Sequence, residues 1–185
     1  MNLTLQKDNK KNNEILIFDT NIFLTGIDFN LLKSEIYTTP NVIEEIKIDK
    51  YINKNRNILN KIQAAIDSKK LILKTPSNKY IEEVDKKSEL TGDYNALSNT
   101  DKELIALTLE LKETVSINIM IYTNDYSMEN LCSELDIPFA PLFKKGIKSK
   151  IIWEVYCPYC KEIKAENLNK NCEKCGLKLK RRPKK

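Results

Sequence analysis

The chain of 185 residues is long enough to bury one core of ordinary size beside a small appendage, and its 41% apolar and 31% charged residues are typical of a globular domain. No apolar run approaches membrane-spanning length, and the first residues lack the hydrophobic stretch of a secretory signal, so we expect a soluble, cytoplasmic protein. The net charge of +5 is unevenly placed: residues 1–150 hold 21 Lys and Arg against 22 Asp and Glu, whereas residues 151–185 hold 10 against 4.

Short apolar runs alternate with segments of helical spacing along most of the chain. Four runs are expected to be strands, at residues 15–18, 35–39, 71–74 and 119–123. A long helical segment is expected over 41–68, a loop over 87–99, and a linker over 144–150. Strands that alternate with helices predict an α/β fold in which helices flank a parallel sheet.

Two helix starts carry capping signals. Thr39 offers a hydroxyl before Pro40, which suits the first helical position. Thr100 and Glu103 have the spacing of a capping box ahead of an apolar run. We therefore expect helices to begin at these two points.

Two aspartates follow the ends of predicted strands. Asp19 comes directly after the run 15–18, and Asp125 follows the run 119–123 by one residue. Because ligands of open α/β sheets gather at the carboxyl ends of the strands, one cleft can hold both side chains. Either residue alone is equally consistent with an exposed loop aspartate.

Two further acids are placed by helix phase. Asp101 lies in a first turn, on the face of Leu104 that is expected to meet the sheet, where the helix dipole favours an anion. Glu45 borders the apolar stripe of its helix, whereas Glu44 falls nearly opposite that stripe. The alternatives are an ordinary helix-start aspartate and a solvated helix face.

Four carboxylates in one cleft repel one another unless a cation lies among them. Hard oxygen ligands select Mg²⁺ or Mn²⁺, and such a metal activates water for attack on a phosphodiester. The chain has no histidine, which excludes the paired-imidazole chemistry of some ribonucleases. We therefore predict a metal site made by Asp19, Glu45, Asp101 and Asp125.

Two CxxC pairs lie near the C-terminus, separated by eleven residues. Their ligands are Cys157, Cys160, Cys172 and Cys175. In a reducing compartment this spacing favours a metal over disulfides, and four thiolates fill a tetrahedral shell, so one structural Zn²⁺ is expected. Iron in a rubredoxin-like site is the alternative. Gly176 suits the tight turn of the second pair.

The basic residues of the C-terminal stretch are candidates for RNA contact. They are Lys178, Lys180, Arg181, Arg182, Lys184 and Lys185. Tyr156 and Tyr159, at the first cysteine pair, can stack on bases. The alternatives are a solvated charge run for the tail and packing over the metal for the two rings.

The ordered motifs FDTNIF, TTPNVIEEI, LSNTDKELIALTLEL and YTNDYSMENL resemble those of PIN-domain nucleases over roughly residues 14–142. Asp19, Glu45, Asp101 and Asp125 fall on that family's acidic positions. Asn124 stands where relatives often carry another acid. The resemblance leaves open whether Asn21, Thr123 or Asn124 contributes to the site.

Together with the cysteine region, the whole chain resembles the archaeal Nin-one-binding family. That resemblance implies a PIN-like nuclease domain at 1–143, a linker at 144–150 and a zinc ribbon with a basic tail at 151–185. It implies an endoribonuclease that matures the 3′ end of precursor small-subunit rRNA within a pre-ribosomal particle, beside assembly-factor proteins. A non-catalytic RNA-binding assembly factor and a PIN-family toxin ribonuclease are the alternatives. Cleavage site, metal identity and oligomeric state stay open.

Overall fold

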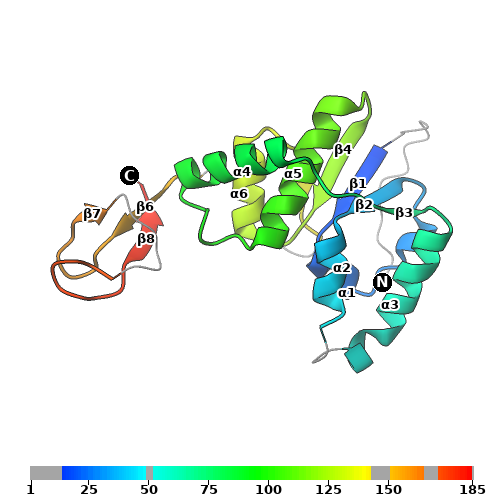
Figure 1. The fold of residues 1–185 in the computed structure, drawn as a ribbon, viewed down its shortest axis with the longest axis horizontal. Coiled ribbons are helices and arrows are strands. Elements are labelled where there is room, and N and C mark those ends of the chain that lie inside the picture. Colours follow the sequence, from blue (N-terminus) through cyan, green and yellow to red (C-terminus); the bar gives the residue numbers. More distant parts are fainter. Residues whose placement is uncertain (1–13, 49–51, 143–150, 165–170, 185) are drawn as a thin grey trace.

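The computed structural model describes residues 14–48, 52–142, 151–164 and 171–184. The larger part is built on a five-stranded parallel sheet with strand order β3-β2-β1-β4-β5 (Figure 1). Its strands are β1 (Glu14–Phe18), β2 (Glu35–Thr38), β3 (Leu71–Leu73), β4 (Asn118–Tyr122) and β5 (Phe139–Ala140). Over the described ranges, no helix is both long and apolar enough to cross a membrane.

The central strand β1 explains the depth of the core. Residues 15–18 are all buried, because β2 and β4 pair with β1 on its two sides. A strand buried on both faces is expected to be continuously apolar rather than alternating, as ILIF is. All pairs are parallel, so the carboxyl ends of β1 and β4 lie side by side, with Phe18 opposite Tyr122.

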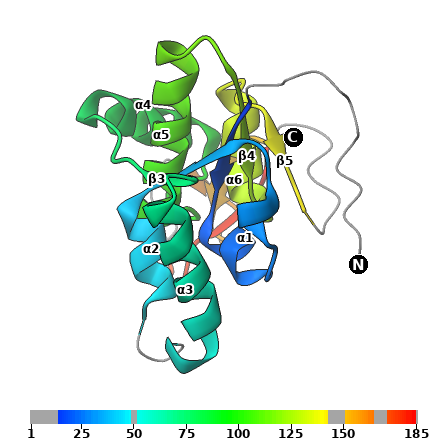
Figure 2. The ribbon, with the colours of Figure 1, turned by 90° about the vertical axis from the view of Figure 1, so that its right-hand side faces the viewer.

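Helices flank this sheet in two groups whose members contact one another (Figures 1 and 2). The first group is α1 (Thr20–Leu24), α2 (Pro40–Ile46) and α3 (Ile52–Asp67), and a short 3₁₀ turn, η1 (Phe29–Leu31), follows α1. The second group is α4 (Asn78–Thr91), α5 (Asn99–Thr114) and α6 (Tyr126–Glu134). The predicted α/β class is confirmed.

A second, three-stranded antiparallel sheet forms the C-terminal part, which we call the ribbon. Its strands are β6 (Trp153–Tyr156), β7 (Ile163–Lys164) and β8 (Lys180–Pro183), in the order β7-β6-β8. In Figure 1 the ribbon lies beyond α4 and α6, at the end of the molecule away from α3. Its buried cluster is small and consists of Cys157, Cys172 and Leu179. Such a core needs a further source of stability. The expected linker, 144–150, lies outside the described residues.

The four predicted strands are correct to within one residue at each end, and β5 adds a short fifth strand. The single helix expected over 41–68 is wrong. It is divided into α2 and α3, which contact each other, so that both bury apolar residues such as Ile46 and Ile62.

The loop expected over 87–99 begins later than predicted. Helix α4 continues to Thr91, because Val84, Ser88 and Thr91 are buried at helical spacing on one face, and it ends where Gly92 takes a left-handed conformation with φ of 77°. The capping box expected at Thr100 lies two residues earlier. Ser98 caps α5, and Asp101 is its reciprocal partner. The other expected start is correct, since α2 begins at Pro40.

Candidate active site and cysteine cluster

Asp19 is the junction between β1 and α1. It caps α1, and only 3% of its surface is exposed. Its Oδ1 accepts hydrogen bonds from the amides of Asn21 and Ile22, and its Oδ2 accepts one from Thr123 Oγ1 at 2.5 Å. The pKa of Asp19 is raised from 3.8 to about 6, mainly by burial and also by the Asp101 carboxylate, against the lowering effect of these donors.

Asp125 stands just past the neighbouring strand, β4, and caps α6. Its Oδ1 accepts from the amide of Ser127 at 2.6 Å, and its own amide donates to Thr123 Oγ1 at 3.1 Å. The fully buried Thr123 hydroxyl therefore connects Asp19 to the start of α6. The strand order reverses between β1 and β4, which is where open α/β sheets place their ligands.

Asp101 is held by the capping box of α5. Its Oδ2 accepts from the amide and the hydroxyl of Ser98, both at 2.8 Å, and its amide donates to Ser98 Oγ at 3.1 Å. Burial raises the pKa of Asp101, the Ser98 donors lower it, and the charges of Asp125 and Glu45 raise it. These two carboxylates are therefore close enough to Asp101 to act on its ionisation.

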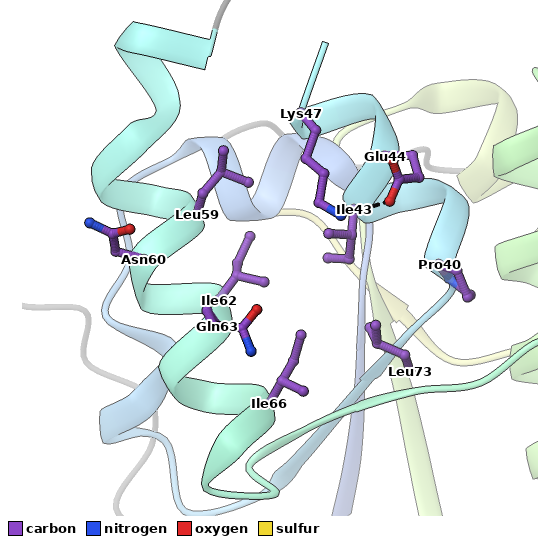
Figure 3. Close-up of a pocket in the computed structure, with 10 residues that line it drawn as sticks. All are labelled: Pro40, Ile43, Glu44, Lys47, Leu59, Asn60, Ile62, Gln63, Ile66 and Leu73. Atoms are coloured by element: carbon purple, nitrogen blue, oxygen red, sulfur yellow. Dashed lines mark hydrogen bonds and ion pairs between the residues drawn. The ribbon is translucent and has the colours of Figure 1, made fainter. Parts of the chain in front are cut away.

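Glu45 approaches the same region from α2, where its Oε2 accepts from Thr20 Oγ1 at 2.6 Å. Glu44 points elsewhere and forms an ion pair with Lys47 at 2.7 Å. Glu44 and Glu45 therefore lie on different faces of α2, as the spacing of its apolar residues predicted. Figure 3 shows Glu44 and Lys47 beside a groove of about 640 Å³ between α2, α3 and β3. Aliphatic side chains line most of that groove, and none of the four acids lines it.

The four acids are electrostatically linked but do not gather into one tight group. Among the described residues, the only potential metal-ligand group whose ligand atoms all lie within 4.8 Å of one another is the cysteine cluster. Asp19 nevertheless stands at the end of β1 and Asp125 at the start of α6, while Glu45 and Asp101 belong to α2 and α5. Each of the four raises the pKa of another member or has its own pKa raised by one. Such a donor set, all oxygen and partly buried, suits a hard divalent cation.

The four cysteines of the ribbon form the second candidate site. Sγ of Cys157 lies 3.4 Å from Sγ of Cys175, and Sγ of Cys172 lies 3.9 Å from Sγ of Cys160. All four are free thiols rather than disulfides. Burial tends to raise the pKa of Cys157, but hydrogen bonds from the Cys160 and Tyr159 amides and from neighbouring thiols outweigh it and lower the pKa to about 7. A thiolate in this position is the form that ligates metal.

The two cysteine turns share one backbone geometry. Lys161 and Gly176 each stand four residues after the first cysteine of their pair and donate an amide to its carbonyl, at 2.9 and 2.7 Å. Both have a positive φ, 62° and 72°. Glycine adopts this conformation without strain, which explains Gly176. The repeated turn presents two thiols on each side of one point, as a tetrahedral ion requires.

The basic residues of the tail differ in their surroundings. Lys178, Lys180 and Lys184 are exposed, and Lys185 lies outside the described residues. Arg182 pairs with Glu154 at 2.6 Å and covers the Tyr156 ring, whereas Arg181 pairs with a buried carboxylate of the larger part. Tyr159 is 74% exposed, so its ring is open to solvent at the first cysteine turn.

Comparison with known proteins places this geometry in a family. A model of the PIN domain of ribonuclease matches residues 16–111, about half of the chain, from within β1 through most of α5. Endoribonuclease Nob1 of Methanocaldococcus jannaschii is 30% identical over 170 residues, which are 91% of this chain and 78% of that protein. The chain belongs to the PIN-domain ribonucleases, in the family of the archaeal endoribonuclease Nob1. The resemblance indicated by the sequence motifs is thereby confirmed.

Two further relatives bear on the alternatives. Ribonuclease VapC1 of Thermoplasma acidophilum is 31% identical over 167 residues, which are 90% of this chain and 77% of that protein. Because the match covers 90% of this chain and residues 151–185 make up more than the remaining tenth, the match extends into the ribbon. The 20S-pre-rRNA D-site endonuclease NOB1 of Saccharomyces cerevisiae is 41% identical over 76 residues, which are 41% of this chain and 15% of that protein.

Proposed function

We propose that this protein is a metal-dependent endoribonuclease that cleaves precursor small-subunit rRNA at its 3′ end within a pre-ribosomal particle. The observation that carries the proposal is Asp19, a buried carboxylate at the strand switch point whose pKa is raised by burial and by a second acid. A protein keeps an expensive group of this kind where its chemistry needs it.

Asp19, Glu45, Asp101 and Asp125 would hold Mg²⁺ or Mn²⁺. When bound, such a cation lowers the pKa of a water and neutralises charge on the scissile phosphate. The residues of the chain supply the orientation. Hydroxyl groups of Thr123, Ser98 and Thr20 orient Asp19, Asp101 and Glu45, respectively. The fourth carboxylate, Asp125, is oriented by the backbone amide of Ser127.

Cys157, Cys160, Cys172 and Cys175 would hold one Zn²⁺ with a structural role, because four protein ligands leave no open position. The domain division proposed from sequence, 1–143 and 151–185 with a linker at 144–150, fits the two separate sheets. The ribbon would hold RNA through Lys178, Lys180 and Lys184, with Tyr159 as a stacking platform.

The substrate class rests on two supports. The yeast relative is named as an endonuclease acting on the D site of 20S pre-rRNA. This chain is 41% identical to it over 76 residues. The ribbon adds a basic surface that suits RNA held outside the acidic cleft. Assembly-factor proteins are expected as further partners.

The VapC1 relative favours a second candidate, a toxin-type ribonuclease. A toxin is usually the catalytic domain alone, but that relative matches beyond it into the ribbon, so its name does not separate the two functions. Substrate does. We expect a single cut near the 3′ end of the precursor rRNA, whereas a toxin-type enzyme would cut other cellular RNA equally well.

Substitution of Asp19 tests the catalytic part of the proposal. Asp19→Asn keeps the shape of the side chain and the acceptor for the Asn21 amide, and burial already disfavours the charge, so the fold should survive. Cleavage of a pre-rRNA 3′-end fragment should fall below one hundredth of the unsubstituted rate. Asp28→Asn is the matched control, since Asp28 is exposed and makes no capping bond. Equal cleavage by the two variants would refute the assignment.

A further inference from the structure

Asp93 is a fully buried carboxylate that the proposed metal site does not use. It lies directly after Gly92, in the loop between α4 and α5. Its Oδ2 accepts from Asn130 Nδ2 at 2.5 Å, and its Oδ1 accepts from Arg181 Nη1 at 3.2 Å. Arg181 belongs to β8 of the ribbon, so a buried charge of the larger part has its countercharge in the smaller part. Breaking a buried pair of this kind is costly, because it leaves one charge uncompensated.

The contacts around this pair are specific on both sides. The Arg181 guanidinium lies over the Trp153 ring, 4.4 Å from its centre, in a cation–π arrangement. Asn130, 3% exposed, donates to the carbonyl of Ile151 and accepts from its amide, both at 2.7 Å. A side-chain amide that matches both polar groups of one residue fixes the chain where it enters β6.

Gly92 adds a steric requirement to the same contact. A Cβ atom built on Gly92 would lie 2.8 Å from Cβ of Trp153, and its φ of 77° strains any other residue. Glycine is therefore needed for the ribbon to approach this closely. We call Gly92, Asp93, Asn130, Trp153 and Arg181 the clasp.

The clasp contacts α6 and the loop that leads to α5, and these two segments adjoin Asp125 and Asp101 of the candidate active site. Arg181 Nη2 donates to Ser127 Oγ at 3.4 Å, and the amide of Ser127 donates to Asp125. On the other side, the loop that begins with Asp93 leads directly to Ser98, the residue that caps α5 and holds Asp101. Arg181 thus contacts Ser127, whose amide holds Asp125, and it contacts Asp93 in the loop that leads to Ser98.

We propose that Arg181 is a positioning residue for cleavage, which docks the ribbon on α6 and the α4–α5 loop so that RNA held by the ribbon is presented to the acids. The inference rests on the proposed nuclease function for its catalytic part, and on contacts alone for its docking part. The exposed lysines 178, 180 and 184 remain available for RNA, whereas the Arg181 head group is engaged inside the protein.

Arg181→Met tests the inference, because methionine keeps an apolar stem on Trp153 and loses the bond to Asp93. Arg182→Met is the matched control, since it removes the same charge from the next residue of β8, and its partner Glu154 lies within the ribbon. We expect both variants to bind RNA about as tightly as each other, because both keep the exposed Lys178, Lys180 and Lys184. In Arg181→Met alone, kcat at saturating pre-rRNA fragment should fall by about tenfold or more, through misplacement of bound RNA.

Backbone ¹⁵N relaxation of the full chain with bound Zn²⁺ tests the docking without reference to activity. In the unsubstituted protein and in Arg182→Met, ribbon and nuclease domain should tumble with one correlation time. In Arg181→Met, and in Gly92→Ala, which blocks the approach of Trp153, the ribbon should tumble faster.

The outcomes are distinguishable. A ribbon that tumbles independently in the unsubstituted protein overturns the inference, whatever the activity. A ribbon released in Arg181→Met with unchanged kcat overturns the positioning role. Should no variant and no unsubstituted protein cleave RNA, the proposed function fails, and the relaxation data alone decide whether the clasp exists.

Discussion

The fold and the proposed chemistry make opposite demands on the charge of Asp19. Burial at the end of β1 favours its neutral form, while metal binding needs its charge. The three donors around it, from Asn21, Ile22 and Thr123, hold a carboxylate in place but do not neutralise it. A cation would remove that cost.

The pH dependence of stability should reveal this cost. The pKa of Asp19 is raised from 3.8 to about 6 in the folded state, so the folded protein is favoured at low pH, and that contribution is lost as pH rises through about 6. The loss amounts to at most ~3 kcal/mol. Mn²⁺ binds the charged form, so it should raise Tm more at pH 7.5 than at pH 5. Thermal melts at both pH values check this, and Asp19→Asn should abolish the difference.

The Thr123 hydroxyl should matter to both stability and metal affinity. Thr123→Val keeps the shape and removes the donor to Asp19 and the acceptor for the Asp125 amide. We expect a loss of ~1 to 3 kcal/mol in the free energy of unfolding, and ~10 to 100-fold weaker Mn²⁺ binding by calorimetry. Thr108→Val is the control, because Thr108 is equally buried but its hydroxyl bonds only the Leu104 carbonyl of its own helix. Equal metal affinity in the two variants would contradict the role of Thr123.

At the scale of the element, strands were predictable, whereas helix ends were predictable only in part: the start of α2 at Pro40 was correct and that of α5 was not. Apolar runs such as ILIF define a buried strand by themselves, whereas Ser98 and Thr100 both precede an acid at capping-box spacing, and tertiary packing decides between them. β5 pairs at only two residues, too few for a pattern. The four candidate acids were proposed from local signals: Asp19 and Asp125 follow strands, Asp101 lies in the first turn of a helix, and Glu45 borders the apolar stripe of its helix. The clasp was not, since Asp93 and Arg181 are 88 residues apart and share no local signal.

The folding of the ribbon should depend on a bound metal ion. Replacing Cys172 and Cys175 with serine removes two of four ligands from a cluster whose own apolar core is small. We expect one Zn²⁺ per chain in the unsubstituted protein, none in the double variant, and RNA binding weakened at least tenfold. Elemental analysis and titration of labelled RNA measure the two effects. kcat should fall no further than in Arg181→Met, and a complete loss of cleavage would indicate a catalytic rather than structural metal.

At the scale of the whole molecule, the nuclease domain is nearly neutral and the ribbon is basic. In the proposed function, the four acids of the domain would repel RNA and the lysines of the ribbon would attract it, so binding and cleavage would use different surfaces. The clasp contacts would fix the spacing between those surfaces. The sequence indicated the two parts and their chemistry, while their mutual placement required the structure.

Cleavage of a precursor-rRNA 3′-end fragment by the intact protein, with and without Mn²⁺ and with analysis of the product ends, tests the central claim most directly. Attack by a water that a bound cation would activate, with the 3′-oxygen as leaving group, would give a 5′-phosphate and a 3′-hydroxyl. We expect a single cut that appears only with Mn²⁺ or Mg²⁺ and carries these ends. Cleavage that persists in chelator, or that leaves a 2′,3′-cyclic phosphate, would contradict a metal site built from the four acids.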